Sequence, residues 1–253
     1  MSTEVARRNT SALAIADNAK AGDTRGTENI DSSDVRLAFI AIAQKTSKAI
    51  DPTETGKFIE GLKFLDMYNS ETREIYGQGP IKFLPIVLRK RAALLKENGT
   101  LGEAVDWNDP RVTWEGAKDA GHDKPEGQQI YDWAVLLLPS YELVVISFRS
   151  KSFSAGKSLN GFVKMRKPSF AGQYELLVEA DKNDKGSFGK FAVRPAGKPT
   201  NDQFDYASDV YNTIANSNIT IAGEGADEPG DAVEGETVQQ PAASAKSDKD
   251  IPF

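Results

Sequence analysis

A stretch in the second half of the chain combines positive charge with aromatic rings. Between Arg149 and Arg194 there are ten basic and four acidic residues. The rings in or beside this stretch are Phe148, Phe153, Phe162, Phe170, Tyr174, Phe188 and Phe191. Binding of a single nucleic-acid strand needs such a mixture, because cations neutralise phosphates and each ring can stack a base for about 1–3 kcal/mol. The stretch is therefore a candidate strand-binding surface.

Two other regions contribute to the same surface in this interpretation. Lys82 and the run Arg89–Arg91 form a second basic cluster, and Trp107, Trp114 and Tyr131 lie in or beside an expected long loop over 97–129. The candidate DNA-binding residues are Lys82, Arg89, Lys90, Arg91, Trp107, Trp114, Tyr131, Arg149, Lys151, Phe153, Lys157, Lys164, Arg166, Lys167, Phe170 and Tyr174.

Several rings have a competing assignment to the hydrophobic core. Phe162 lies on the apolar stripe of an expected helix, and Phe148 alternates with Ile146 on a strand, so both are expected in the core. Arg149 then lies on the opposite face of that strand from Phe148. Stacking and packing stay open for Phe153, Phe170 and Tyr174, and some loop aromatics are expected only to anchor the loop.

No catalytic or metal site is expected. Gly156-Lys157-Ser158 resembles part of a phosphate-binding loop, but Lys151 occupies the position where that motif needs its first glycine. The chain has no cysteine and one histidine, His122, which excludes thiolate sites and ordinary zinc ligation. We therefore expect a protein that is not an enzyme and that binds no cofactor.

The end of the chain carries the most specific motif, Asp250-Ile251-Pro252-Phe253. Ile251 and Phe253 can fill an apolar pocket, and Pro252 limits the entropy lost on docking. This tip resembles that of bacterial single-stranded-DNA-binding proteins, whose acidic tails end in the same four residues. The resemblance implies that replication and recombination proteins bind here. Lys249 departs from the family, which usually has a run of acids at this point.

Negative charge is concentrated in the segment that precedes this tip. From Gly223 onward there are eight acidic and two basic residues, a net charge of −6. The whole chain also has a net charge of −6, so residues 1–222 are neutral overall. The acids of the tail repel DNA and favour partners with basic surfaces.

The elements that position these residues are expected to be mainly strands. We predict strands over 35–44, 58–68, 74–76, 81–91, 130–138, 142–149, 174–180 and 188–193, with Pro85 at an edge or a bulge. Apolar residues at helical spacing predict helices over 154–165 and 202–215. The polar composition of 1–29 and 218–253 predicts disordered termini around one domain over 30–217.

This order of elements predicts a mainly β fold, an elaborated oligonucleotide-binding (OB) barrel with one short inserted helix and a C-terminal helix. In segment order, and in stretches such as 64–69 and 133–149, the body looks like phage single-stranded-DNA-binding proteins of this fold. The resemblance implies a cytoplasmic protein that coats single-stranded DNA without strong sequence preference during replication, recombination and repair.

Other functions stay open at this point. One is a recombination mediator or replisome adaptor that mainly binds protein, and another is a virion or assembly protein whose charges are merely solvated. No apolar run is long enough for a membrane span, so no membrane partner is expected. The sequence is compatible with a homo-oligomer.

Overall fold

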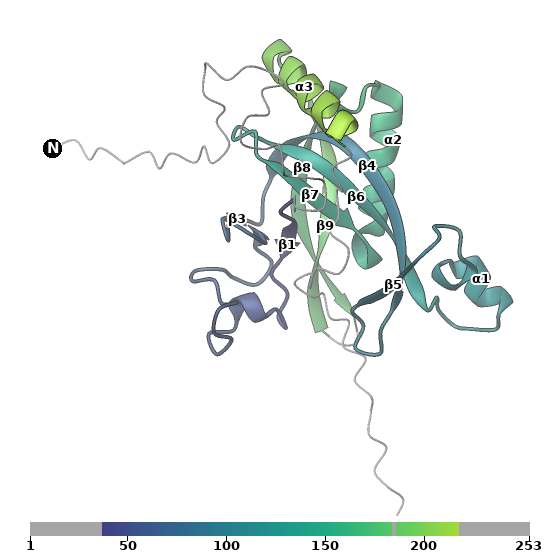
Figure 1. Cartoon of the computed structure of the whole chain (residues 1–253). Helices are drawn as coiled ribbons and strands as arrows, with labels where there is room; N and C mark the ends of the chain where they lie inside the picture. Colours follow the sequence, from purple (N-terminus) through teal and green to yellow (C-terminus); the bar gives the residue numbers. More distant parts are fainter. Residues whose placement is uncertain (1–36, 184–185, 218–253) are drawn as a thin grey trace, which may run out of the picture.

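The computed structural model describes residues 37–183 and 186–217, which form a mainly β structure, as predicted (Figure 1). The larger sheet contains β4 (Ile81–Leu95), β5 (Leu101–Val105), β6 (Gly127–Leu138), β7 (Leu143–Phe148), β8 (Gln173–Asn183) and β9 (Gly186–Gly197). The smaller sheet contains β1 (Ile40–Ile42), β2 (Met67–Asn69) and β3 (Ile75–Gly77). The helices are α1 (Trp114–Asp119), α2 (Phe153–Arg166) and α3 (Asn201–Ser217). Single 3-10 turns lie at Lys48–Ile50, Pro110–Val112, Ser150–Ser152 and Ser169–Ala171.

The strand order of the larger sheet is that of an OB barrel. Its order is β7-β6-β4-β8-β9, every neighbouring pair is antiparallel, and β5 pairs with the far end of β4. The helix α2 connects β7 to β8. Strands β4, β6, β7, β8 and β9 thus take the five positions of this Greek-key barrel, with the helix between the third and fourth strands. The predicted fold class is confirmed.

The N-terminal strand segment lies between the two ends of this sheet. On one side, Phe39 forms a parallel bridge with Val145 of β7. On the other, the side-chain amide of Gln44 donates to the Gly189 carbonyl of β9 and accepts from the Gly189 N–H, both at 2.9 Å. One buried side chain therefore takes the place of a backbone ladder at this closing contact.

A bulge in β4 divides the strand into two parts. Leu84 and Pro85 pair with Leu136 and Val135, but Val87 pairs with Ala134, so Ile86 is the extra residue. Pro85 has no N–H to donate, and a bulge accommodates it in a strand with neighbours on both sides. Before the bulge β4 also pairs with β8, through Ile81, Lys82 and Phe83. Beyond it the strand continues with β6 and curves away (Figure 1).

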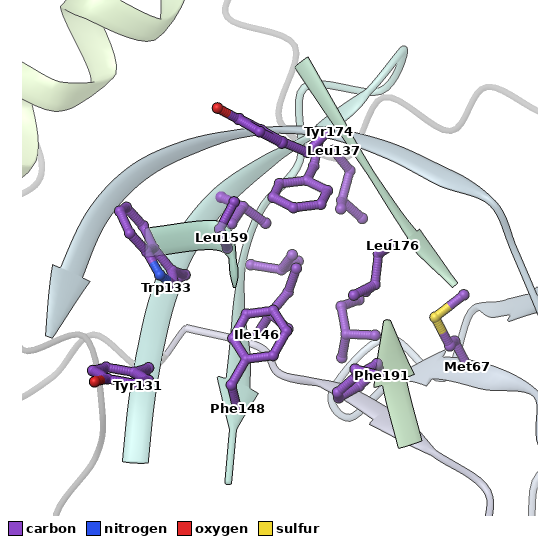
Figure 2. Close-up of a cluster of buried hydrophobic side chains, with 14 of the residues drawn as sticks. Met67, Tyr131, Trp133, Leu137, Ile146, Phe148, Leu159, Tyr174, Leu176 and Phe191 are labelled. Atoms are coloured by element: carbon purple, nitrogen blue, oxygen red, sulfur yellow. The ribbon is translucent and has the colours of Figure 1, made fainter. Parts of the chain in front are cut away.

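The barrel encloses the main hydrophobic core (Figure 2). Side chains of β6, β7, β8 and β9 point inward from alternate positions, as period-two alternation requires. The side chains of this core include Phe83, Trp133, Phe148, Leu159, Tyr174 and Phe191. Phe148 and Phe162 are thus in or against the core, as predicted.

The outer face of β4 and β6 is covered by α3. Phe204, Ala207, Val210 and Ile214 of the helix pack on Leu84, Ile86 and Leu136 of the strands, together with Phe170. Four of these side chains are on the apolar face of the helix at three- and four-residue spacing, which explains the predicted helix over 202–215. No helix in the described part of the chain is long and apolar enough to cross a bilayer.

Two predictions about elements are wrong. Most of the predicted strand over 58–68 consists of turns and irregular backbone, with positive φ at Gly61 and Leu65, and only Met67–Asn69 is a strand. Its apolar side chains Ile59 and Leu62 pack in a small core of their own. The expected loop over 97–129 is an arm, here defined as residues 96–126, that contains β5 and α1. The segments 1–29 and 218–253, which were predicted to be disordered, lie outside the described residues.

Candidate nucleic-acid interface

Three aromatic rings from separate elements meet beside the barrel. Tyr131 of β6 stacks on Phe153 of α2, with centroids 4.8 Å apart and planes at 7°. Trp107 of the arm contacts both, with centroids 5.1 Å from Tyr131 and 6.4 Å from Phe153. Tyr131 is 8% exposed, whereas Trp107 and Phe153 are half-buried. The buried ring therefore supports two rings that keep accessible surface.

A lysine stands over each of the two outer rings. The Lys90 ammonium lies 5.3 Å from the Trp107 centroid, and the Lys157 ammonium lies 5.0 Å from the Phe153 centroid. Both lysines are exposed, and no ion pair involving either is found among residues 37–183 and 186–217. We call Lys90, Trp107, Tyr131, Phe153 and Lys157 the aromatic–lysine cluster.

The bulge in β4 determines which basic residue joins this cluster. Side chains alternate along a strand, and one extra residue shifts the alternation by one position. Phe83 points into the barrel before the bulge and Leu88 packs on the same core after it. Lys90 therefore lies on the inner face opposite Tyr131, while Arg89 and Arg91 lie on the outer face.

A glycine lets α2 approach the sheet closely enough to complete the cluster. A Cβ on Gly156 would lie 2.7 Å from the Phe148 Cβ and 3.0 Å from the Tyr131 Cδ2. Glycine inside a helix lowers helix stability by about 1 kcal/mol relative to alanine. The close approach of α2 to the sheet explains why a glycine is present at this position. The Gly156-Lys157-Ser158 sequence thus lies within α2 and serves helix packing.

Trp107 is fixed through its backbone. The side-chain amide of Gln129 donates to the Trp107 carbonyl at 2.9 Å. Gln129 belongs to β6, two residues before Tyr131, so it points to the same face. This hydrogen bond ties the arm to the strand that carries the central ring.

A second pairing of a cation with a ring lies next to the cluster. Lys151 Nζ is 6.0 Å from the centroid of Phe188, which is half-buried on the β8–β9 hairpin. Lys151 precedes Phe153 by two residues, so the hairpin and the start of α2 meet here. Phe188 is one of the rings interleaved with basic residues in the sequence, but it is not among the sixteen candidate DNA-binding residues.

The basic charge is distributed unevenly over the predicted stretch. Residues 143–174 contain six basic residues and no acid: Arg149, Lys151, Lys157, Lys164, Arg166 and Lys167. On the hairpin that follows, Lys190 contacts Asp181 at 3.0 Å and Arg194 contacts Glu175 at 2.6 Å. The hydrogen bond from Lys190 lowers the pKa of the Asp181 carboxyl and raises the pKa of Lys190. The excess positive charge therefore lies with α2 and its flanks.

The outer face of the sheet holds a different set of basic residues. Arg91 Nε donates to Asp132 Oδ2 at 2.5 Å, and the Ser147 hydroxyl donates to the other carboxylate oxygen at 2.5 Å. Asp132 is fully buried. Arg89 also has an outward position on β4, and Arg149 directly follows the end of β7. The charge of Arg91 is thus used to compensate a buried carboxylate.

Two candidates named from sequence are incorrect as base-stacking rings. Phe170 is 5% exposed and packs against Phe204 of α3, with centroids 5.0 Å apart. Tyr174 has no exposed surface and lies in the barrel core. A base cannot reach either ring, because packing in the core excludes it.

The remaining candidates lie away from the cluster. Trp114 is 72% exposed on α1, and Lys82 is exposed near the start of β4. Lys164 and Lys167 are exposed near the end of α2, while Arg166 donates to the Gly197 carbonyl at 3.1 Å. The structure therefore brings five of the sixteen candidates into one cluster, with Lys151 beside it. No group of three metal-ligating side chains occurs among the described residues.

The fold and this cluster define a mainly β barrel of OB strand order with a surface of rings and lysines. A family model described as "Pam3 phage gp34-like protein" matches residues 6–220. The chain therefore belongs to the Pam3 phage gp34-like family, which supports the predicted phage origin. No curated protein and no solved structure matches the chain.

Proposed function

We propose that this phage protein binds single-stranded DNA without strong sequence preference and acts in replication, recombination and repair in the host cytoplasm. The observation that carries the proposal is the aromatic–lysine cluster. Bases stack on the accessible parts of Trp107 and Phe153, and Lys90 and Lys157 neutralise neighbouring phosphates. The role is one of binding and involves no catalysis.

The position of the cluster on the barrel supports this proposal. OB barrels bind oligonucleotides with the loop after the first strand, the loop between the last two strands, and the nearby sheet surface. Here the arm supplies Trp107 and the β8–β9 hairpin supplies Phe188. Both elements that flank such a site thus contribute a ring next to a lysine.

Partner recruitment is the second part of the proposal. Residues 250–253 lie outside the described part, and their role is inferred from the motif. The acidic tail competes for the basic surface when DNA is absent, and DNA binding releases it for replication and recombination proteins. This competition requires that the tail weakens DNA binding.

The binding surface is tested by fluorescence titration of full-length protein with oligo(dT) and with duplex DNA at several salt concentrations. Trp107→Ala and Phe153→Ala should each weaken binding to the single strand by about 5- to 150-fold, the range of one lost stacking contact. Phe58→Ala, at a half-exposed ring outside the cluster, is the matched control. Equal affinities for wild type and both cluster variants would refute the proposal.

The tail is tested separately with chains that end at residue 222 or at residue 249. The shorter chain should bind oligo(dT) at least as tightly as the full-length protein at low salt, and weaker binding would refute the competition. The chain that ends at 249 should keep its DNA affinity and lose binding to replication proteins. Binding to long oligonucleotides weaker than micromolar, with tight partner binding through Phe253, would favour a protein adaptor.

A further inference from the structure

Two large apolar side chains are far more exposed than the others of the described residues. Met165, near the end of α2, is 86% exposed, and Trp114, at the start of α1, is 72% exposed. The other exposed large apolar side chains reach at most 41%. Tryptophan and methionine are enriched in protein–protein interfaces relative to the rest of the surface.

The surroundings of these two side chains carry opposite charge. The arm that carries Trp114 contains eight acidic and four basic residues. Met165 lies within residues 143–174, where there are six basic residues and no acid. Glu115 and Asp119 are exposed on α1, and Lys164 and Lys167 are exposed beside Met165. The two surfaces are therefore complementary.

The two surfaces lie at opposite ends of the sheet. The turn after α2 is fixed near the bulge, where the Ser169 hydroxyl donates to the Ile86 carbonyl at 2.7 Å. The arm leaves β4 at Leu95, nine residues further, which corresponds to about 30 Å of strand. Figure 1 shows α1 and the end of α2 well apart. The surfaces of one molecule therefore do not meet each other.

We propose that the α1 surface of one copy docks on the end of α2 of a second copy. The Trp114 ring contacts Met165 and Lys164, since rings attract both sulfur and cations. Glu115 and Asp119 face Lys164 and Lys167, which gives the contact its direction. Lys164 and Lys167 are thereby assigned to the neighbouring copy, although sequence alone suggested a DNA contact for both.

A contact between two different surfaces repeats from copy to copy. Such a head-to-tail contact gives an open row unless its rotation closes a ring. This proposal rests on the proposed DNA-binding function, because a row of copies places successive aromatic–lysine clusters along one strand. Binding of neighbouring copies to a long strand is then cooperative.

Charge reversal provides the test, with full-length protein throughout. One variant carries Glu115→Lys and Asp119→Lys, and the other carries Lys164→Glu and Lys167→Glu. Each alone should lose self-association in sedimentation velocity and lose cooperative binding to long poly(dT). An equimolar mixture should regain both, because every arm then meets an α2 end of opposite charge.

Matched controls separate this contact from general charge effects. Asp205→Lys with Asp209→Lys on α3, and Lys57→Glu with Lys63→Glu in the loop before β2, change net charge equally at exposed sites. Both control proteins should associate like the wild type. Trp114→Ala and Met165→Ala should each lower the cooperativity at least about tenfold while leaving affinity for a short oligo(dT) unchanged.

Two results would overturn the inference. The first is a wild-type protein that stays monomeric and binds long poly(dT) without cooperativity, and the second is a mixture that does not regain association. If the protein still binds short oligo(dT) in these experiments, the inference alone fails. Loss of all binding to oligo(dT) by the wild type would instead refute the proposed function.

Discussion

Beyond the bulge in β4, neighbouring basic residues on the inner and outer faces of the strand have different roles. Lys90, on the inner face, is exposed above the Trp107 ring. Arg91, one residue further, is bound to a fully buried carboxylate on the outer face. The two residues are adjacent in sequence and alike in charge, but only one has a charge available to a ligand.

This comparison shows that the basic character of a segment does not by itself locate a binding surface. The ammonium group at the end of a lysine side chain above a ring remains hydrated and can bind a phosphate. If the Arg91 guanidinium moved away to bind a ligand, the Asp132 carboxylate would remain buried without an opposite charge, which is energetically costly. Five variants test whether burial decides the role of a side chain; the first two carry the largest expected effects and the last one the smallest.

Arg91→Ala should cause a large loss of stability. Removing one partner of a buried ion pair typically costs about 3–5 kcal/mol, because the other charge stays buried without compensation. Urea denaturation measures the change, and Lys90→Ala is the matched control on the other face, with an expected cost below about 1 kcal/mol. Similar stability of the two variants would contradict the contrast between the faces.

Phe170→Ala should destabilise the protein by about 3–5 kcal/mol, the usual cost of truncating a buried phenylalanine. Its affinity for oligo(dT), measured at a temperature where the variant is folded, should equal that of the wild type. The ring packs under α3 and not on the binding surface. A tenfold loss of affinity in fully folded Phe170→Ala would show that the buried ring takes part in binding.

Phe153→Ala should lower the affinity for single-stranded DNA and have a smaller effect on stability, the reverse of Phe170→Ala. Loss of a stacking contact weakens single-strand binding by about 1–3 kcal/mol. The midpoint of urea denaturation should change less than in Phe170→Ala, since Phe153 is only partly buried. If Phe153→Ala loses stability but keeps its affinity, the ring is simply part of the core.

Lys90→Gln should reduce affinity modestly and in a salt-dependent manner. Each phosphate contact that is lost should change the slope of log affinity against log salt concentration by about 0.7. The measurement is a salt titration of oligo(dT) binding. An unchanged slope would mean that Lys90 meets no phosphate.

Glu74→Gln should have the smallest effect on stability, and the size of this effect depends on pH. Burial, followed by repulsion from Glu142, raises the pKa of the Glu74 carboxyl above its usual value of 4.5. A raised pKa means that the folded state binds the proton more tightly, so wild-type stability falls as pH rises through that window. The variant should therefore be at least as stable as the wild type at neutral pH, and its advantage should disappear below the window. Thermal denaturation at several pH values measures this, and a larger advantage in acid would contradict the sign.

Much of the fold could be predicted from periodicity. The helices α2 and α3 and the strands β6 to β9 were predicted within a few residues, because each carries a long, regular apolar pattern. The region over 58–68 was not, since its apolar residues pack around turns and form no regular face. Turn conformation at Gly61 and Leu65 depends on that packing.

The site was only partly visible in the sequence. Pro85 indicated a bulge or an edge, but nothing in the sequence shows that Ile86 is the inserted residue. The choice between Lys90 and its two neighbours depends on that single position. Likewise, local sequence could not distinguish Phe153 from Phe170, because Phe170 is covered by Phe204 of α3, a helix that begins 31 residues later in the sequence.

The closing contact at Gln44 constrains substitution at two positions that are distant in the sequence. A long side-chain amide presents a donor and an acceptor side by side, as a peptide unit does, so it can donate to the Gly189 carbonyl and accept from its N–H at once. A shorter or charged side chain at 44 would lose at least one of the two bonds. Any side chain at 189 would bring a Cβ within 2.9 Å of both Ile42 and Leu65. A library of all single substitutions should therefore be depleted at these two positions, while tolerating change at their exposed neighbours such as Lys45.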